Sequence, residues 1–283
     1  MSDPSSDGII YNGEFYRAGS PVLTVSTRGL RYGDGLFETL LVQNGRIRLR
    51  DFHFDRLWNG MRRLMFEPPA DLTAENLTRQ IMDLCLKNGH SSLGRVRLMV
   101  FRGEGSLFDA ARGPLNYVIE STLLTPGQIA FNESGLRVGV YRDLRKSRDF
   151  LANLKSNNFL LYTMAARYVR DQGWDDCLVL NDSERVADSC MANLFYIRKG
   201  TVYTPPLSEG CVAGVMRRFL LERMPCWGFT VREQPVSVGE LGGAAEIFLT
   251  NAVRTIRWVG EFAGRTYRQQ LARELYELAV KEA

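Results

Sequence analysis

Lys155 has the surroundings in this 283-residue chain that most favour chemistry. It lies between the charged run 142–149 and the apolar stretch 159–166, and no other titratable side chain separates these two segments. Desolvation at such a boundary can penalise the charge of an amine, which lowers its pKa and frees it to act as a nucleophile or a base. The alternative interpretation is a lysine at a helix start that extends its charge into water.

Histidine is too scarce for several common kinds of active site. The chain has only His53 and His90, which argues against a histidine-based zinc site and against a Ser-His-Asp triad. Its five cysteines lack a CxxC spacing and are expected to be free thiols. We therefore expect no metal, and we expect acid–base chemistry from lysine, carboxylates or a cofactor.

Two turns have residues that suit a phosphate. In residues 210–218, glycines and small residues are followed directly by a helix. The first N–H groups of that helix could bind an anion. A plain loop-to-helix junction is the alternative. Residues 249–253 place Thr250 and Asn251 after a buried strand, as a second phosphate contact or as a strand cap.

Asp188 is a lone acid in a small, mostly apolar neighbourhood, where an unpaired charge would be costly. Its partner could be the protonated ring nitrogen of a cofactor, or Arg185. A lysine, phosphate-binding turns and an isolated carboxylate together indicate pyridoxal phosphate.

Two arginines are further candidates. Arg56 lies on a helix with a well-defined apolar face, where most arginines are solvated. Arg102 closes a strand, where its fork could receive a carboxylate through two hydrogen bonds; an exposed loop is the alternative.

Composition restricts the class of protein. Hydrophobic residues make up 45% and charged residues 24% of the chain, which is ordinary for a globular protein. The net charge of +4 is scattered, so we expect no nucleic-acid partner. We find neither a signal peptide nor an apolar run of roughly 18–20 residues, and we expect a cytoplasmic protein without a membrane partner.

The elements that position these residues follow from hydrophobic spacing and turn signals. The first half has two hairpins about Asn-Gly turns, two helices and two further strands: 8–16, 39–49, 51–64, 71–86, 95–102 and 116–120. The second half has strands at 136–141, 177–180, 194–197, 201–205 and 246–250, with helices at 159–172, 214–223 and 267–281. A loop is expected to join 177–180 to 194–197.

These elements predict an α+β protein of two domains. The N-terminal α/β domain would comprise residues 1–122, and the C-terminal domain, which would hold the cofactor, residues 136–283. Residues 123–135, within a stretch rich in Thr, Pro, Gly, Asn and Ser, are the expected linker.

The order of the segments resembles the class IV (fold type IV) pyridoxal-phosphate enzymes, which include branched-chain and D-amino-acid aminotransferases and aminodeoxychorismate lyases. The resemblance runs from Tyr11 to Val259 and rests on the glycine-acid-glycine motif in 28–39, the Asn193-x-Phe195 pair and the turn 214–217. It implies a smaller N-terminal α/β domain and a larger C-terminal domain with a barrel-like sheet.

The resemblance also implies roles for individual residues. Lys155 would form the Schiff base with the cofactor, and Asp188 stands where the family has a glutamate against the pyridine nitrogen. The other implied cofactor contacts are Arg56, Asn158, the backbone N–H groups of Val215 and Met216, and Asn251 with Ala252.

The motifs lie closest to the aminodeoxychorismate lyases, in which a threonine at the position of Thr39 is implicated in catalysis. Such an enzyme releases pyruvate and 4-aminobenzoate after Lys155 removes a proton. The alternative is an aminotransferase of branched-chain or D-amino acids with an oxo-acid acceptor, for which Arg102 would bind the substrate carboxylate as in the D-amino-acid enzymes. Phe37 and Arg102 are the expected substrate contacts. Either way we expect a small-molecule amino substrate and a homodimer.

Overall fold

The computed structural model describes residues 7–109 and 115–283, and the chain divides into two units. The first unit takes the chain as far as Gln128 and also includes Lys155–Asn158. The second comprises Ile129–Leu154 and Phe159–Ala283. The passage from Gln128 to Ile129 falls within the segment 123–135 and inside the short helix α4 (Pro126–Ile129). Lys155 therefore belongs to the first unit, although the residues on either side of Lys155–Asn158 belong to the second.

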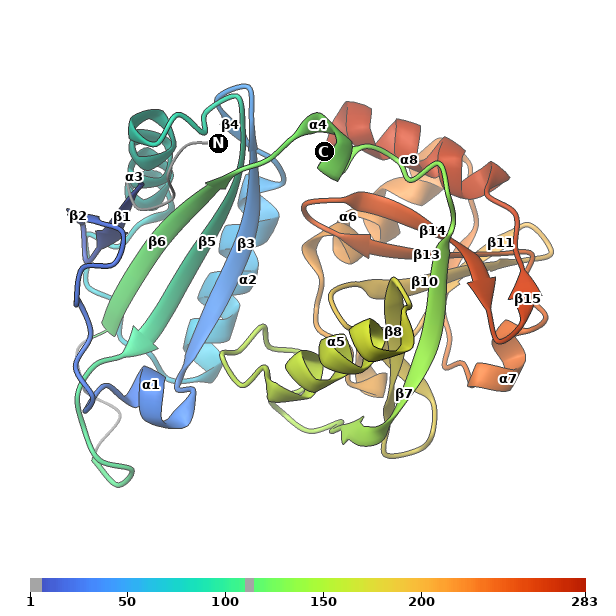
Figure 1. Ribbon diagram of the computed structural model, residues 1–283, viewed down its shortest axis with the longest axis horizontal. Helices are drawn as coiled ribbons and strands as arrows, with labels where there is room; N and C mark the ends of the chain where they lie inside the picture. The colour runs from blue at the N-terminus through green and yellow to red at the C-terminus, as the bar shows by residue number, and fades with distance from the viewer. Residues whose placement is uncertain (1–6, 110–114) are drawn as a thin grey trace. The chain divides into compact units, whose positions relative to one another are not determined.

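An antiparallel sheet of six strands forms the first unit over the residues that the structure describes (Figure 1). In order across the sheet these are β2 (Glu14–Arg17), β1 (Gly8–Tyr11), β6 (Leu115–Leu123), β5 (Leu93–Arg102), β3 (Gly35–Gln43) and β4 (Arg46–Ile47). Asn12 and Asn44, each followed by glycine, adopt positive φ, as tight hairpin turns require. Both predicted hairpins are confirmed.

Among its described residues, the first unit also contains the helices α1 (Arg28–Tyr32), α2 (Arg50–Arg63) and α3 (Ala74–Lys87). In α2 the apolar spacing seen in the sequence buries Phe54, Leu57 and Met61, and this helix packs against β3. Thr73 caps α3 by accepting a hydrogen bond from the N–H of Asn76.

Residues 155–158 extend the sheet of the first unit beside the start of β3. The N–H of Phe37 donates to the Lys155 carbonyl and the N–H of Asn157 to the Gly35 carbonyl, each over 2.9 Å. A Cβ at Gly35 would lie 2.5 Å from both the Asn157 amide and the Val100 carbonyl oxygen. Glycine at this position therefore makes room for the lysine segment.

The second unit is built on one curled sheet. Its strands in order are β12 (Val231–Glu233), β11 (Thr201–Thr204), β10 (Asn193–Arg198), β13 (Glu246–Asn251), β14 (Thr255–Phe262), β7 (Leu136–Lys146), β8 (Asp176–Asn181) and β9 (Val186–Ser189), with β15 (Arg265–Thr266) beside β14. Although β9 ends this order, it also lies against β10, so the sheet curls toward a barrel. The pairs of β7 with β14 and with β8 are parallel.

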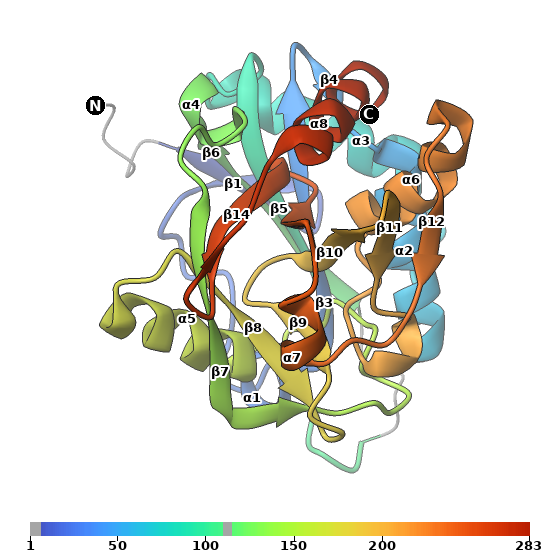
Figure 2. The same ribbon diagram turned by 90° about the vertical axis from the view of Figure 1, so that its right-hand side faces the viewer.

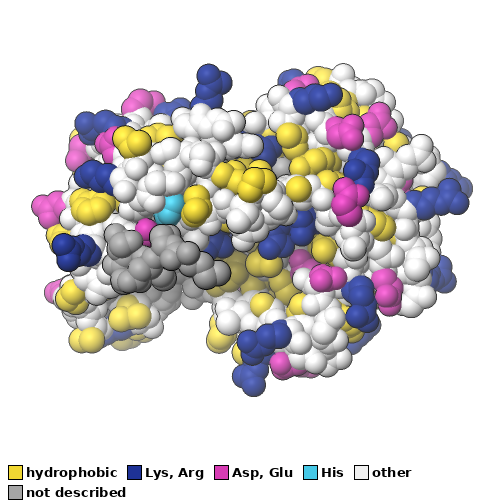
Figure 3. Space-filling model, turned by 45° about the horizontal axis from the view of Figure 1, so that its top comes forward, with side chains coloured by type: hydrophobic (Ala, Val, Ile, Leu, Met, Phe, Trp, Pro, Cys, Tyr) yellow, Lys and Arg dark blue, Asp and Glu magenta, His cyan; other side chains and the backbone are white. Residues whose placement is uncertain are grey.

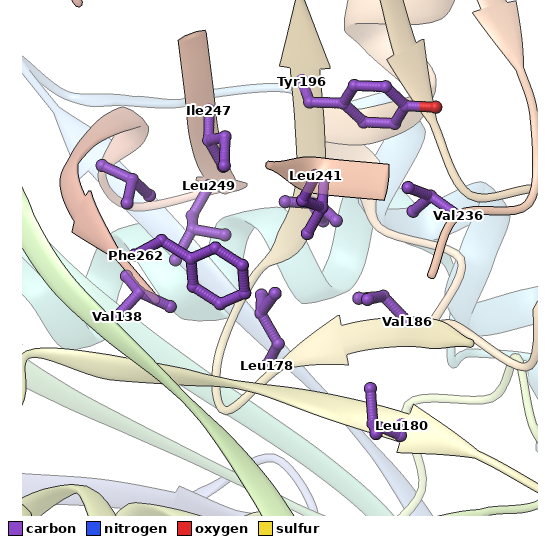
Figure 4. Packing of buried hydrophobic residues seen from close by; sticks show 12 residues of the cluster. Val138, Leu178, Leu180, Val186, Tyr196, Val236, Leu241, Ile247, Leu249 and Phe262 are labelled. Carbon is purple, nitrogen blue, oxygen red and sulfur yellow. The ribbon is translucent and has the colours of Figure 1, made fainter. Parts of the chain in front are cut away.

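Helices lie on the curled sheet, with α8 along β13 and β14 (Figure 2). The helices of this unit are α5 (Leu160–Gln172), α6 (Val215–Arg223), α7 (Val238–Leu241) and α8 (Gln270–Glu282), with short 3-10 turns η2 (Leu207–Glu209) and η3 (Met224–Trp227). Figure 4 shows the interior, where Val138, Leu178 and Phe262 point toward one another from three different strands.

Parts of the second unit differ from the sequence-based expectation. The predicted loop between β8 and β10 is wrong, because Val186–Ser189 forms the strand β9. The strand β14 was not predicted; a bulge between Val259 and Glu261 breaks its alternation. The strand β7 also extends to Lys146, beyond the expected end at residue 141. The sequence of these additional residues indicated only a run of charged side chains.

Basic side chains lie dispersed among acidic and apolar ones on the face shown in Figure 3. Across residues 7–109 and 115–283, no helix is both long and apolar enough to cross a membrane.

Gly35→Ala should lower the free energy of unfolding by about 1–3 kcal/mol, because the new Cβ would overlap backbone that cannot move away. Urea unfolding of the purified apoprotein measures this change. Gly127→Ala is the matched control: a Cβ there meets nothing within 4 Å, and we expect a change within about 0.5 kcal/mol. Equal stabilities of the two variants would contradict the close packing of Gly35 against Val100 and Asn157.

Candidate active site

The side chain of Lys155 lies over the ring of Phe37, with its Nζ 4.4 Å from the ring centroid. Arg97 on β5 contacts the same ring, its Cζ lying 4.1 Å from the centroid. Thr39 is half-buried two residues along β3, on the Phe37 side, and pairs in register with Arg97. Arg97 was not among the residues expected at the site, although strand alternation separates it from its buried neighbours Val96 and Leu98.

The acid of the glycine-acid-glycine motif has two arginine partners. Arg28 Nε lies 3.0 Å from one Asp34 oxygen, and Arg102 Nη1 lies 3.5 Å from the other. Gly33 has φ 65° and would clash with Asn158 if it carried a Cβ. Asn158 itself donates weakly to the Gly33 carbonyl, over 3.4 Å. The motif thus fixes the turn on which the lysine segment rests, while a cofactor contact for Asn158 stays a prediction.

Arg102 is 3% exposed. Besides Asp34, its guanidinium binds the carbonyl oxygens of Leu64 and Met65, and it packs over the ring of Phe66. These contacts tie the C-terminal end of α2 to β5 and give Arg102 a structural role. Binding of a substrate carboxylate by Arg102 stays a prediction, and its hydrogen bonds within the first unit do not support it.

Arg56 projects from α2 to Glu38 on β3. Its Nε and Nη2 donate to the two carboxylate oxygens of Glu38 over 2.7 and 2.5 Å. The Nδ1 of His53 also binds Glu38, over 2.6 Å. Burial alone would raise the pKa of Glu38, but Arg56 and His53 outweigh it and bring that pKa to about 2.

Asp188 is 2% exposed on β9 and accepts three hydrogen bonds. The donors are the Tyr162 hydroxyl, the Asn193 amide and the backbone N–H of Val212, at 2.9, 2.8 and 2.8 Å. Arg185, the ordinary partner considered from the sequence, instead forms two hydrogen bonds with Glu209.

Burial raises the pKa of Asp188 from 3.8 to about 6, against the lowering effect of the Lys146 charge and of its three donors. Lys146 lies at the end of β7, donates to the Ala152 carbonyl and has its Nζ 5.7 Å from the Tyr162 ring centroid. This buried carboxylate is therefore ready to accept a further donor or a cationic ring nitrogen.

The turn before α6 is built around Asn193. Its amide donates to the Val212 carbonyl as well as to Asp188, and its oxygen would lie 1.9 Å from a Cβ at Gly214. Gly214 therefore cannot be replaced without moving Asn193. The N–H groups of Val215 and Met216 begin α6, where a helix has no internal acceptors for them. This turn can hold an anion.

The segment after β13 contains an unsatisfied hydroxyl. Thr250 is 1% exposed, and its Oγ1 has no hydrogen-bond partner among the described residues. Thr250 is also the register partner of Asn193 on β10. The side-chain oxygen of Asn251 accepts from the N–H groups of Val253 and Arg254, so Asn251 organises its own turn. Direct anion contacts by Asn251 and Ala252 stay predictions, and Thr250 joins them as a candidate.

A metal site finds no support in this geometry: within the described ranges, no group of three or more His, Cys, Asp or Glu side chains could hold an ion. The first unit contains an amine and an arginine. The second contains a helix start, a buried hydroxyl without a partner among the described residues, and a buried carboxylate acceptor. By type, these groups suit the parts of a phosphorylated aldehyde with a basic ring nitrogen.

Known proteins resemble this chain along most of its length. Residues 35–262 match the family described as amino-transferase class IV. The chain is 28% identical to the aminodeoxychorismate lyase of Vibrio harveyi over 80% of this chain and 82% of that protein. It is 26% identical to the branched-chain-amino-acid aminotransferase of Pseudomonas aeruginosa over 94% of this chain and 88% of that one.

A solved structure gives the same fold. The crystal structure of 4-amino-4-deoxychorismate lyase from Pseudomonas aeruginosa matches with a TM-score of 0.83 and 31% identity. The match covers 97% of this chain and 98% of that one.

The raised pKa of Asp188 makes a pH-dependent contribution to the stability of the apoprotein. The contribution is complete below the unfolded pKa near 3.8 and disappears as pH rises through about 6. Between pH 4 and 7 wild type should therefore lose on the order of 2–3 kcal/mol relative to Asp188→Asn. Urea titrations at several pH values measure this difference in the free energy of unfolding. If that free energy changes with pH in the same way in wild type and Asp188→Asn, the prediction is wrong.

Proposed function

This chain belongs to the class IV aminotransferase family and has the fold type IV architecture, and within that family we propose that it is an aminodeoxychorismate lyase. The family and the fold expected from the sequence are confirmed, as is the barrel-like second sheet. The reaction, the substrate and the individual roles of the residues below are the proposal.

Enzymes of this family use pyridoxal 5′-phosphate, which when bound withdraws electrons from the carbon that carries the substrate amine. In this chain Lys155 would bind the cofactor covalently, and Arg56 with the N–H groups of Val215 and Met216 would bind its phosphate. The unsatisfied hydroxyl of Thr250 and the acceptor capacity of Asp188 support this fit. Asp188 would hold the ring nitrogen in its protonated form.

The observation that carries the lyase proposal is the grouping of Lys155 and Thr39 about Phe37 in the first unit. We propose that Lys155 Nζ accepts the proton from the amine-bearing carbon of aminodeoxychorismate. Loss of that proton and cleavage of the ring carbon–oxygen bond form the aromatic ring of 4-aminobenzoate. The departing enolpyruvyl group takes up a proton to give pyruvate, and Thr39 is the hydroxyl proposed to assist there.

The similarity to solved and curated lyases supports this assignment, while branched-chain aminotransferases match over a similar share of the chain. Within one organism, Pseudomonas aeruginosa, the lyase is 31% identical to this chain and the branched-chain aminotransferase 26%. Arg97 keeps the aminotransferase as the second candidate, because its guanidinium over Phe37 could bind the carboxylate of an amino acid as well as that of the lyase substrate.

The two candidates give opposite results with the wild-type holoenzyme. We expect aminodeoxychorismate to yield equimolar 4-aminobenzoate and pyruvate, and we expect an amino acid without an oxo-acid acceptor to leave the cofactor absorbance unchanged. Lys155→Ala should abolish product formation and prevent borohydride from attaching the cofactor to the protein.

Thr39→Val is the matched variant of the lyase test, since it removes the hydroxyl and keeps the shape. It should lower kcat by roughly a hundredfold or more while cofactor binding persists. Loss of the cofactor absorbance with leucine or D-alanine alone, and no 4-aminobenzoate, would establish the aminotransferase instead.

We also propose a homodimer. Large apolar side chains stand exposed on α1 and on two loops that meet beside it; Val25 is 80% and Leu30 63% exposed. The loops are joined by a hydrogen bond from Arg28 N–H to the Gly103 carbonyl and by a bridge between Thr27 and Glu104. A connected apolar surface of this kind typically binds another protein surface.

Light scattering should give twice the mass of one chain for wild type. The double variant Val25→Ser, Leu30→Ser should shift the protein toward the monomer, because it removes apolar area from that surface. Val280→Ser, on a half-exposed position of α8, is the control. A wild-type protein with the mass of a single chain rejects the dimer.

A further inference from the structure

Glu38 is a buried acid with no assigned role in the reaction. It lies on β3 next to Phe37 in sequence, but strand alternation directs its side chain to the opposite face of the sheet, toward α2. It is 2% exposed, and His53, which binds it, is fully buried. Charges this deeply buried are costly unless they are fully paired.

Three hydrogen bonds converge on the carboxylate of Glu38. Arg56 occupies one oxygen with Nε and the other with Nη2, an arrangement that fixes the plane of the guanidinium. His53 Nδ1 adds a third contact, to the oxygen that Nη2 also binds. With Nε and Nη2 held in this way, Nη1 is directed away from Glu38.

His53 acts as a neutral donor in this arrangement. Burial lowers its pKa, although its contact with Glu38 acts in the opposite direction. A neutral imidazole that donates from Nδ1 has an unprotonated Nε2. The Nε2 of His53 is buried and has no hydrogen-bond partner within the part of the chain that the structure describes. The group therefore has one negative charge on Glu38, one positive charge on Arg56 and a neutral imidazole.

We propose that Glu38, held by His53, is the positioning residue that sets the orientation in which Arg56 meets the cofactor phosphate. The inference rests on the proposed function, which assigns that contact to Arg56. A free arginine side chain has many rotamers and loses much of this entropy when it is ordered. Pairing with Glu38 would remove most of this cost before the phosphate arrives, which is the effect of preorganisation on affinity.

Simple electrostatics predicts the opposite effect of Glu38. A carboxylate near the phosphate site repels a phosphate, so removal of its charge should strengthen binding if repulsion dominates. Positioning predicts weaker binding on the same substitution. The sign of the change in pyridoxal phosphate affinity therefore distinguishes repulsion from positioning.

The test compares two ligands of the apoenzyme, pyridoxal phosphate and pyridoxal, which share the ring and the aldehyde and differ in the phosphate. Glu38→Gln should weaken pyridoxal phosphate binding by roughly tenfold or more and pyridoxal binding by less than about twofold. Absorbance titration measures both dissociation constants. Unchanged or tighter binding of pyridoxal phosphate would overturn the proposal.

A double-mutant cycle shows whether Glu38 acts through Arg56. In the Arg56→Met background, Glu38→Gln should change pyridoxal phosphate affinity by less than about twofold, because its target is gone. An undiminished effect in that background overturns the positioning role. If Arg56→Met alone leaves the affinity unchanged, the phosphate contact in the proposed function fails, and the positioning role fails with it. If Arg56→Met weakens pyridoxal phosphate binding but Glu38→Gln has no effect on it, only the positioning role is overturned.

Glu246→Gln is the matched control for the loss of a buried carboxylate. Glu246 is 5% exposed and accepts from the N–H groups of Leu271 and Ala272 at the start of α8. We expect Glu246→Gln to lower the urea midpoint and to leave the ratio of the two dissociation constants unchanged. If the ratio of the pyridoxal phosphate to the pyridoxal dissociation constant rises as much in Glu246→Gln as in Glu38→Gln, the effect is general destabilisation and the proposal is wrong.

Discussion

The placement of the candidate lysine depends on two backbone hydrogen bonds between segments far apart in the chain. Phe37 and Asn157 donate them, and through them residues 155–158 extend the sheet of the first unit. The same pairing fixes the side chains on either side of β3: Phe37 beneath Lys155, and Glu38 against Arg56. Gly33 and Gly35 matter because side chains there would displace the paired segment.

The buried acids Glu38 and Asp188 are tuned in opposite directions by their neighbours. Glu38 pairs with the permanently charged Arg56, so its pKa falls to about 2 and it remains ionised. Asp188 has neutral hydrogen-bond donors and a more distant lysine, so burial dominates and its pKa rises to about 6. The first arrangement suits a rigid support. The second suits a group that gains a cationic partner when a ligand binds.

The features that could be predicted from the sequence are those set by local patterns. Asn12-Gly13 and Asn44-Gly45 specify their hairpins, and the spacing of Phe54, Leu57 and Met61 specifies a helix. Lys155 stood out because its neighbours in sequence are uncharged. The family resemblance supplied the order of the remaining segments.

Features that depend on distant contacts could not be predicted in this way. The strand at Val186–Ser189 exists because β8 pairs with it, and four small residues carry too little pattern to reveal that. The contacts of Arg102 with the end of α2, and of Arg56 with Glu38, join elements whose approach no local spacing encodes. Thr250 belongs to a segment that the sequence indicated as a phosphate contact or a strand cap, but its unsatisfied buried hydroxyl can be recognised only once its surroundings are folded.

The return of Lys155–Asn158 to the first unit has a consequence for how activity develops during folding. Contacts between residues far apart in sequence form slowly, because the chain must first close a long loop. The pairing of β3 with this segment closes such a loop, which includes all of β5, β6 and β7. A ribosome-bound chain that ends before residue 155 would contain the strands β1 to β6 of the first sheet but lack the lysine proposed to bind the cofactor. Covalent capture of the cofactor would therefore report late native assembly rather than early collapse.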